Sequence, residues 1–410
     1  MNHYHTIVVG GGQAGLGVSY YLTQKSINHT VLERGNIGES WKSQRWDSFM
    51  LNSANSMSEL PGDENTLGNR AGFLSRDEFV DCLKAYTQKF ELPVQTGITV
   101  TKISKGSAGE NYQIQTTAGQ MTADNVVIAS GSQNQPKIPS VSSEIPGSLM
   151  QLHSGDYKKP DALPAGATLV IGSGQSGVQV VEDLLDAGRK VYFSTSRVGR
   201  FVRRFRGRDM LVWANDIGFF SQRMSEVEDP NIAKMAQPQI SGTKGGHTVS
   251  LQSLEKMGAI LLGRYQGYRG NEFHFEENLT ENIMFADQIS AKFRGMVDDY
   301  IVKQGIDAPP ADVDEADHAD PNPEDRHPPT VLDPAEAGIT SIVWCTGFGG
   351  NFSWIEGVDL DEKGVPVHEN GVSPLAGLYY CGFAWLSKRR SGLICGIKED
   401  AAYIVEHIHE

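Results

Sequence analysis

Short apolar runs alternate with a helical repeat over the first 33 residues of the chain. Residues 7–9 form a β-branched run typical of a buried strand, and the apolar positions of residues 16–24 recur at helical spacing. Residues 30–32 are again strand-like and end at Glu33. The pattern therefore predicts a strand, a helix and a second strand, with a glycine-rich turn between the first two.

This turn has the spacing GxGxxG. Gly10 allows the tight turn, Gly12 lets the backbone approach a pyrophosphate, and Gly15 lets helix and strand pack closely. The helix start offers N–H groups to phosphates, and Glu33 lies where an acid accepts hydrogen bonds from an adenosine ribose. Such a unit at the N-terminus holds FAD more often than a nicotinamide. The predicted binding residues of this unit are Gly10, Gly12, Gln13, Ala14, Gly15, Glu33 and Arg34.

A second unit of the same kind begins near residue 168. Residues 169–171 predict a strand, residues 178–187 a helix and residues 191–193 the next strand. The turn between the first strand and the helix repeats the GxGxxG spacing, so a second dinucleotide is expected there. Its predicted binding residues are Gly172, Gly174, Gln175, Ser176 and Gly177.

The strand over residues 191–193 is followed by hydroxyls and guanidiniums, with no carboxylate placed to meet a ribose 2′-OH. Ser196 and Arg197 come first, and Arg200, Arg203 and Arg204 are close behind. Because arginine presents a bidentate fork to phosphate oxygens, this ending favours NADPH over NADH. The alternative is that these arginines form a solvated basic patch.

Two intact units imply two dinucleotides, and a flavin with the nicotinamide that reduces it is the economical pair. The alternative is a duplicated module with one degenerate site. We therefore expect an α/β protein with two Rossmann-like domains, the NADPH domain inserted in the FAD domain, as in glutathione reductase. The expected FAD domain covers residues 1–155 and 331–410, and the NADPH domain covers residues 156–330 with an acidic loop at 307–328.

The rest of the chain carries weaker patterns of the same two kinds. Residues 73–90 predict an amphipathic helix, with Ser75 and Glu78 as a capping box. Residues 279–300 predict a long helix, and the turn at residues 391–396 opens a last helix that runs to residue 408. A small sheet that crosses back to the main one is expected from the strand-like runs near residues 94, 98–103, 112–116 and 125–129. Further strands are expected at 259–262, 339–344 and 377–383.

Three features leave two interpretations open. Trp41 and Trp46 follow the ribose-binding acid and either cover a flat ring or plug their loop onto the core. His247, in a glycine-rich loop, either faces a ligand or is a satisfied loop histidine. Residues 307–325 are rich in Asp, Ala and Pro and predict a mobile acidic loop, not a metal site.

Length and charge narrow the class of protein. A chain of 410 residues suits two domains, and its net charge of −14 argues against a nucleic-acid or anionic-membrane surface. No apolar stretch has the length of a membrane span, and residues 1–5 lack the pattern of a secretory signal, which predicts a cytoplasmic protein. Four scattered cysteines without a CxxC pair suit a reducing compartment.

Together these pieces resemble the flavin-containing monooxygenases of the class B flavoprotein family, and most closely a bacterial branch described as flavoproteins involved in potassium transport. The resemblance rests on the two GxGxxG units, GESW…QRWDS at residues 38–48, ASG at 129–131, CTG at 345–347 and the C-terminal helix entry. The family fingerprint FxGxxxHxxxYK is half present. His153, Tyr157 and Lys158 keep its second half, whereas Gly147 and Leu149 replace its Phe and first Gly.

The resemblance implies roles for single residues. It implies FAD at the first unit, with Trp41 and Arg45 beside the flavin, and NADPH at the second unit with Ser196 and Arg197. Gly347, in the CTG motif, is implied as a further cofactor contact. The family asparagine that faces flavin and nicotinamide matches Asn55, and the sequence does not separate Asn55 from Asn52.

The implied activity is that of an NADPH-dependent monooxygenase. Reduced FAD forms a C4a-hydroperoxide with O2, which oxygenates a nitrogen or sulfur atom of a small molecule, and no metal is needed. A flavoprotein reductase without a stable oxygen adduct is the first alternative, and a redox-sensing regulator is the second. A homodimer is the expected assembly by resemblance.

Overall fold

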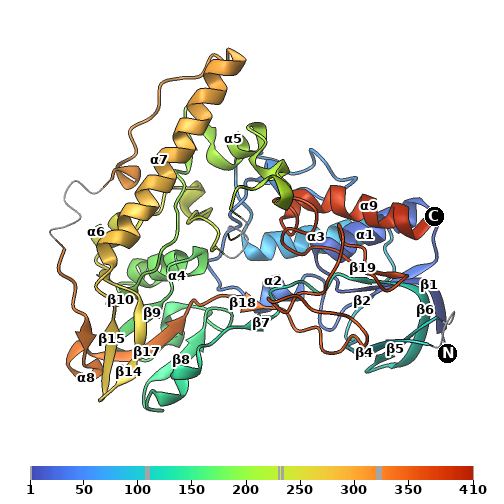
Figure 1. Ribbon diagram of the computed structural model, residues 1–410, viewed down its shortest axis with the longest axis horizontal. Coiled ribbons are helices and arrows are strands. Elements are labelled where there is room, and N and C mark those ends of the chain that lie inside the picture. Colours follow the sequence, from blue (N-terminus) through green and yellow to red (C-terminus); the bar gives the residue numbers. More distant parts are fainter. Residues whose placement is uncertain (1, 107–110, 230, 232–234, 320–325, 410) are drawn as a thin grey trace.

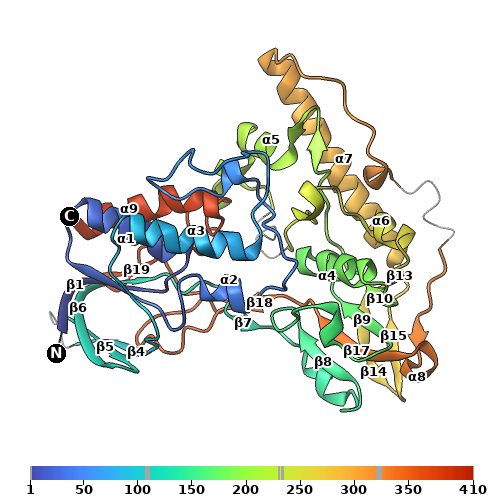
Figure 2. The ribbon, with the colours of Figure 1, turned by 180° about the vertical axis from the view of Figure 1, so that it is seen from behind.

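The computed structural model describes residues 2–106, 111–229, 231, 235–319 and 326–409. Two sheets lie side by side, each with helices packed against it (Figure 1). This arrangement confirms the expected α/β class with two Rossmann-like units. Turning the molecule by 180° shows the same two bodies from behind, with the segments between them crossing the middle of the molecule (Figure 2).

The first sheet has seven strands and is built around the first glycine turn. Its order is β3-β2-β1-β6-β5-β4, with β19 beside β6. The strands are β1 (Asn2–Val9), β2 (His29–Leu32), β3 (Val94–Gln95), β4 (Val100–Lys105), β5 (Tyr112–Thr116), β6 (Gly119–Ile128) and β19 (Leu378–Tyr380). The pairs β1–β2 and β1–β6 are parallel, whereas β4–β5 and β5–β6 are antiparallel.

The small sheet expected within residues 94–129, crossing back to the main one, is not a sheet of its own, because its strands continue the sheet of β1. β6 runs parallel to β1 from the pair Asn2–Met121 to the pair Val9–Ile128. Val126, Val127 and Ile128 are fully buried. A strand apolar on both faces belongs inside a covered sheet and not in a small exposed one, which explains the difference.

The second sheet has five parallel strands in the order β13-β10-β9-β17-β8. They are β8 (Met150–His153), β9 (Ala167–Ile171), β10 (Val191–Ser194), β13 (Ile260–Leu262) and β17 (Ile339–Trp344). β8 and β17 fall in the segments expected for the FAD domain, yet both pair in this sheet. The domain boundaries stay a prediction, and limited proteolysis followed by mass analysis of the fragments measures them.

Short antiparallel pairs flank the two sheets. β14 (Tyr265–Arg269), β15 (Glu272–Phe275) and β16 (Val331–Leu332) form one group, and β7 (Gln135–Pro136) pairs with β18 (Phe348–Gly349). β11 (Arg204–Phe205) pairs with β12 (Arg208–Asp209). The β7–β18 pair joins the two connections between the sheets.

The helices cover the sheets. α1 (Gln13–Gln24), α3 (Arg76–Lys89) and α9 (Ile397–His409) lie over the first sheet, and α4 (Gln175–Asp186) and α6 (Leu251–Lys256) lie beside the second (Figure 1). The long α7 (Leu279–Gln304) projects from the second body. The short helices are α2 (Glu39–Ser43), α5 (Met210–Asp216) and α8 (Pro334–Ala337). The capping box predicted at Ser75 and Glu78 is present at the start of α3.

Candidate functional site

A cavity of about 1660 Å³ lies between the two bodies and is lined by both glycine turns. β1 leads into the first turn and β9 into the second, so the carboxyl ends of parallel strands face this space, as is usual for ligand sites in α/β proteins. Gly15 and Gly177 lie beneath the turns and do not line it. The predicted binding residues that line the cavity are Gly10, Gly12, Gln13, Ala14, Glu33, Arg34, Trp41, Arg45, Gly172, Gly174, Gln175, Ser176, Ser196, Arg197 and Gly347.

The first turn has room for a ligand at one glycine and none at the other two. A Cβ on Gly15 would lie 1.9 Å from the carbonyl oxygen of Gly10, and a Cβ on Gly10 would lie 2.5 Å from that of Ala129. At Gly12 no atom lies within 4 Å of the same position. The turn is therefore closed toward the protein and open toward the cavity, which is the shape that a pyrophosphate needs.

The second turn repeats this geometry. A Cβ on Gly177 would lie 1.9 Å from the Gly172 carbonyl oxygen, whereas a Cβ on Gly174 would have no atom within 4 Å. Gly172 has a φ of +104°, a conformation that side chains disfavour. Gly174 caps α4 without a side-chain hydrogen bond, so the first N–H groups of the helix remain available to an anion.

Glu33 is fixed at the end of β2 by two backbone donors. The N–H of Gly11 donates to its Oε2 at 2.6 Å, and the N–H of Gly35 donates to its Oε1 at 2.9 Å. A carboxylate has about four lone-pair positions, so these two bonds orient the group and leave acceptors for ribose hydroxyls. The position agrees with the role predicted for Glu33.

The basic group after β10 divides into residues that face the cavity and residues that do not. Ser196 and Arg197 line the cavity. Arg200 is 1% exposed and pairs with Asp287 at 2.7 Å and with Asp317, and Arg203 is buried against Asp209. Arg204 is exposed and donates to the carbonyl oxygen of Gly245. Of these four arginines, Arg197 is the one that lines the cavity.

Arg264 is a lining residue that the sequence analysis missed. It follows β13, the neighbour of β10 in the parallel sheet, and lines the same cavity as Arg197. Residues that follow adjacent parallel strands meet at one edge of a sheet. The signal was an arginine shortly after a strand: Arg264 follows Leu262 by two residues, as Arg197 follows Ser194 of the neighbouring strand by three.

Arg45 is a buried cation held among aromatic rings. Its guanidinium carbon lies 5.4 Å from the Trp41 ring centre, 5.6 Å from that of Phe49 and 6.0 Å from that of Phe348. Burial lowers the pKa of Arg45 to about 10, which leaves it protonated at neutral pH. Trp41 itself donates to Gln13 Oε1 at 2.8 Å. The loop after Glu33 thus packs onto the first turn and lines the cavity at once.

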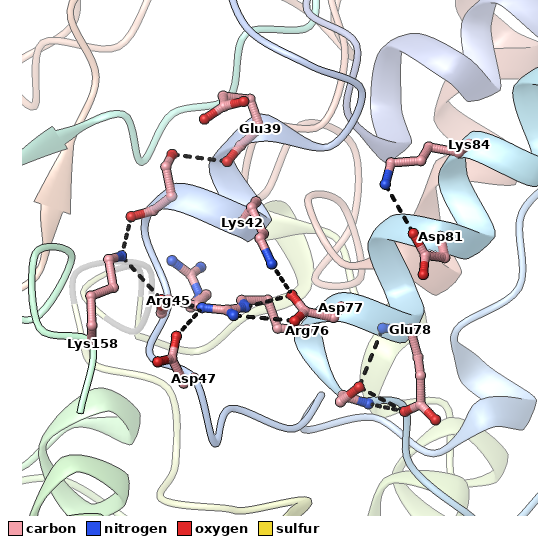
Figure 3. Close-up of polar contacts among 12 residues, drawn as sticks. Glu39, Lys42, Arg45, Asp47, Arg76, Asp77, Glu78, Asp81, Lys84 and Lys158 are labelled. Carbon is pink, nitrogen blue, oxygen red and sulfur yellow. Dashed lines mark hydrogen bonds and ion pairs between the residues drawn. The ribbon is translucent and has the colours of Figure 1, made fainter. Parts of the chain in front are cut away.

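His153, Tyr157 and Lys158, the retained half of the family fingerprint, connect the loop of Arg45 with both bodies. Lys158 Nζ donates to the carbonyl oxygens of Ser43, Arg45 and Gly155, and Figure 3 shows it beside the Arg45 loop, where Arg76 bridges Asp47 and Asp77. Two further bonds act in the same way. The His153 ring bonds the Gly347 carbonyl oxygen at 2.9 Å, and the Tyr157 hydroxyl donates to Asp183 of α4 at 2.5 Å. These three side chains position the walls of the cavity.

Asn52 and Asn55 lie differently with respect to the cavity. Asn52 lines it, donating to Gln175 Oε1 at 3.0 Å and accepting from Gln179 Nε2 at 2.8 Å. Asn55 is buried, is not a lining residue, and donates to the carbonyl oxygen of Asn69 at 3.1 Å. The geometry therefore favours Asn52, the alternative to Asn55 that the sequence left open, as the asparagine that faces the cavity.

His247 is held by a buried acid. Its Nε2 lies 2.7 Å from Glu182 of α4, and its Nδ1 bonds the Thr243 carbonyl oxygen at 3.1 Å. Lys244 also pairs with Glu182, at 3.2 Å. These contacts favour the interpretation of His247 as a satisfied loop histidine, and it does not line the cavity.

The His247–Glu182 pair makes stability depend on pH. The hydrogen bond from Glu182 raises the pKa of His247 above its ordinary 6.5 and outweighs burial, so the contribution is complete below pH 6.5 and is lost as the pH rises through the raised pKa. We expect the difference in Tm between the wild type and His247→Gln to be largest near pH 6 and to shrink toward pH 9, in thermal unfolding scans. A difference that grows with pH would contradict the assignment.

One acid of the predicted acidic loop, Asp317, is part of a buried ion-pair network. Asp317 is buried, pairs with Arg200 and accepts from Ser290 at 2.5 Å. Asp320, Glu324 and Asp325 lie outside the described residues. Among the residues that the structure does describe, no group of three or more His, Cys, Asp or Glu side chains is placed to hold a metal ion.

Two general findings concern the cysteines and the helices. All four cysteines are free, and burial raises the pKa of Cys345 to about 12. No helix within the described ranges combines the length and the apolar character that a membrane crossing requires.

Comparisons with known proteins agree with this geometry. The model of the pyridine nucleotide-disulphide oxidoreductase family matches residues 7–206. The uncharacterized oxidoreductase CzcO of Bacillus subtilis is 30% identical over 410 residues, covering 99% of each chain. The flavin-containing monooxygenase of Stenotrophomonas maltophilia has a TM-score of 0.68 at 19% identity, covering 100% of this chain and 99% of that one. OTEMO in complex with FAD and NADP has a TM-score of 0.59 at 13% identity, covering 99% and 85%.

Proposed function

The chain belongs to the oxidoreductase family that includes CzcO of Bacillus subtilis, and from that premise we propose that it is an NADPH-dependent FAD monooxygenase. In this proposal FAD, reduced by NADPH, forms a C4a-hydroperoxide with O2 and oxygenates a nitrogen or sulfur atom of a small molecule. The family match and the likeness to flavin monooxygenases support a flavin oxidoreductase, and the finer steps are the proposal.

One observation carries it: two glycine turns of the same geometry line a single cavity. FAD is assigned to the turn at Gly12 with Glu33, and NADPH to the turn at Gly174 with Ser196 and Arg197. A flavin and a nicotinamide that share one space can exchange a hydride directly. The related fold of OTEMO, which binds FAD and NADP together, supports this pair.

The side chains of this chain bind, orient and exclude water. Trp41, Arg45 and Lys158 fix the wall that follows Glu33, and the cavity lies between the two bodies. An amide nitrogen carries two N–H groups, and Asn52 uses one for Gln175 within the described part of the chain. We assign its second N–H to the oxygenated flavin or to the nicotinamide amide, in place of Asn55.

The test of the activity is double-mixing stopped flow. The FAD-loaded protein is mixed anaerobically with NADPH and then with oxygenated buffer, while the flavin spectrum is followed. The proposal predicts a long-lived oxygenated-flavin spectrum. Direct return to oxidised flavin with release of peroxide would instead establish the reductase alternative.

The asparagine assignment is tested in the same instrument with two matched variants. Asn52→Asp should keep FAD bound and reducible but shorten the lifetime of the oxygenated flavin roughly 10- to 100-fold, since one fixed donor to developing charge is lost. Asn55→Asp serves as the matched substitution away from the cavity and should change the lifetime little. The reverse order of effects would return the role to Asn55.

Coenzyme preference gives a further prediction. Arg197→Gln should raise the KM for NADPH roughly tenfold or more and leave that for NADH nearly unchanged, because a charge-assisted bond to the 2′-phosphate is lost. The matched control is Arg204→Gln, an exposed arginine that donates to Gly245 and does not line the cavity. Equal changes for the two coenzymes in Arg197→Gln would remove this residue from the 2′-phosphate site.

A small-molecule substrate and O2 are the partners that this activity needs, and the proposal includes no nucleic acid or membrane. The cytoplasmic location and the homodimer stay predictions, which cell fractionation and light scattering of the purified protein measure.

A further inference from the structure

Three consecutive basic residues, 388–390, follow β19. Two of them pair with an acid, and the third lines the cavity. Lys388 pairs with Glu399 at 2.6 Å, and Arg390 pairs with the same acid at 3.0 Å. Arg389, between them, lines the cavity. Within the described ranges, no carboxylate lies at ion-pair distance from its guanidinium. Its charge is therefore not neutralised by the protein around it.

The guanidinium of Arg389 is held in one place. Its carbon lies 4.0 Å from the Phe219 ring centre and 4.7 Å from that of Trp385. Its Nε and Nη2 donate to Gln222 Oε1 at 3.1 and 2.9 Å, and its backbone N–H donates to the Gln222 carbonyl oxygen at 2.8 Å. Nη1 has no hydrogen-bond partner in the described part of the chain. A rigid cation with spare donors is prepared for an anion.

The walls near Arg389 are apolar. Trp385 and the segment of Phe219 pack directly on its guanidinium, and Phe201 packs near Phe219, with ring centres 6.3 Å apart. The lining residues that cluster with Phe219 are Phe201, Leu211, Phe220 and Ile240.

We propose that this end of the cavity binds the substrate, and that the substrate carries a carboxylate on an apolar body of about the size of an aromatic ring. Arg389 Nη1 pairs with the carboxylate, while the phenyl and indole walls cover the apolar body. That the ligand is the substrate rests on the proposed function. That it carries a carboxylate on an apolar body rests only on the residues that line this end of the cavity. A protonated amine is repelled by the unneutralised cation, so the site favours thioether sulfur or uncharged nitrogen as the oxygen acceptor.

The test uses binding of inert probes, so that it does not depend on turnover. Phenylacetate and phenylacetamide differ only in charge at one end. Their Kd values are measured by isothermal titration calorimetry on the FAD-loaded protein saturated with NADP+. The wild type should bind phenylacetate at least roughly tenfold more tightly than phenylacetamide, the range of a charge-assisted hydrogen bond.

Arg389→Gln should weaken phenylacetate roughly 10- to 100-fold and leave phenylacetamide within about twofold. Lys388→Gln is the matched control, because it removes the neighbouring charge that pairs with Glu399 outside the cavity wall, and it should change neither Kd. Arg389→Lys keeps the charge without the planar fork and should fall between the wild type and Arg389→Gln.

Three results would overturn the inference. They are equal binding of the two probes by the wild type, equal weakening of both probes in Arg389→Gln, and loss of NADP+ or FAD affinity in that variant, which would assign Arg389 to a cofactor. The wild-type comparison holds even where a variant fails to fold. Failure of the proposed function is seen separately, as absence of the oxygenated flavin while probe binding is retained.

Discussion

Replacing Gly174 with alanine should strongly slow reduction by NADPH while the protein stays folded and keeps FAD. Gly174 has φ −69° and ψ −173°, an extended conformation that any residue adopts, and no atom lies within 4 Å of its Cβ position. The added methyl group therefore meets only the dinucleotide. We expect the Kd for NADPH to rise roughly a hundredfold, about 3 kcal/mol, since bonds from the start of α4 to the phosphates are lost.

The measurement is a titration of the FAD-loaded variant with NADP+, together with a thermal unfolding scan. Gly147→Ala is the matched control, because its Cβ position is also open but lies outside the cavity. Gly12→Ala should produce the mirror result, with FAD lost from the first turn. Undiminished NADP+ binding by Gly174→Ala would contradict the assignment of the second turn.

Replacing Arg200 with leucine should cost up to about 3–5 kcal/mol in the free energy of unfolding, since it removes one of the two arginines that pair with a buried carboxylate. That carboxylate, Asp317, is buried with Arg200, accepts from Ser290 and keeps Arg294 at 3.2 Å. The interaction joins the segment after β10 to the segment after α7, far apart in sequence. Urea unfolding of the FAD-loaded protein measures the loss, and Arg204→Leu, at an exposed arginine, should change stability little.

The double variant Arg200→Leu/Asp317→Leu separates charge from packing. Removing Asp317 as well takes away the buried carboxylate that has lost Arg200, while Arg294 loses its partner there, so stability should recover only in part. If Arg200→Leu alone is as stable as the wild type, the buried pair does not hold this segment, and the assignment of Arg200 to structure and not to phosphate loses its support.

Much of the fold could be predicted from the sequence, because both strand–turn–helix–strand units are determined by short local patterns. The apolar run at residues 339–344 predicts a strand with the bounds that the structure has, Ile339–Trp344, and the capping box at Ser75 marks the start of α3. The glycine spacing also predicted the shape of both turns, because the steric need at Gly15 and Gly177 is local: an added Cβ there would meet the carbonyl oxygen of the first glycine of the same turn. Such features depend on few distant residues.

What the sequence left open depends on tertiary contacts. The sequence places Arg200 and Arg203 next to Arg197, and the contacts with Asp317 and Asp209 show that two of the three are buried in ion pairs. That the strands β4, β5 and β6 continue the sheet of β1 could not be predicted locally, because the neighbour of a strand is set by the whole topology. Arg389 could be found only once Glu399 was seen to neutralise its two neighbours.

The central claim is that both dinucleotides share one cavity, so that bound NADPH reduces bound FAD directly. An anaerobic titration of the FAD-loaded protein with NADPH, followed by flavin absorbance, tests it most directly. We predict complete bleaching of the flavin at a single equivalent of NADPH, and much slower bleaching in Gly174→Ala. Binding of NADPH without any bleaching in the wild type would contradict the account.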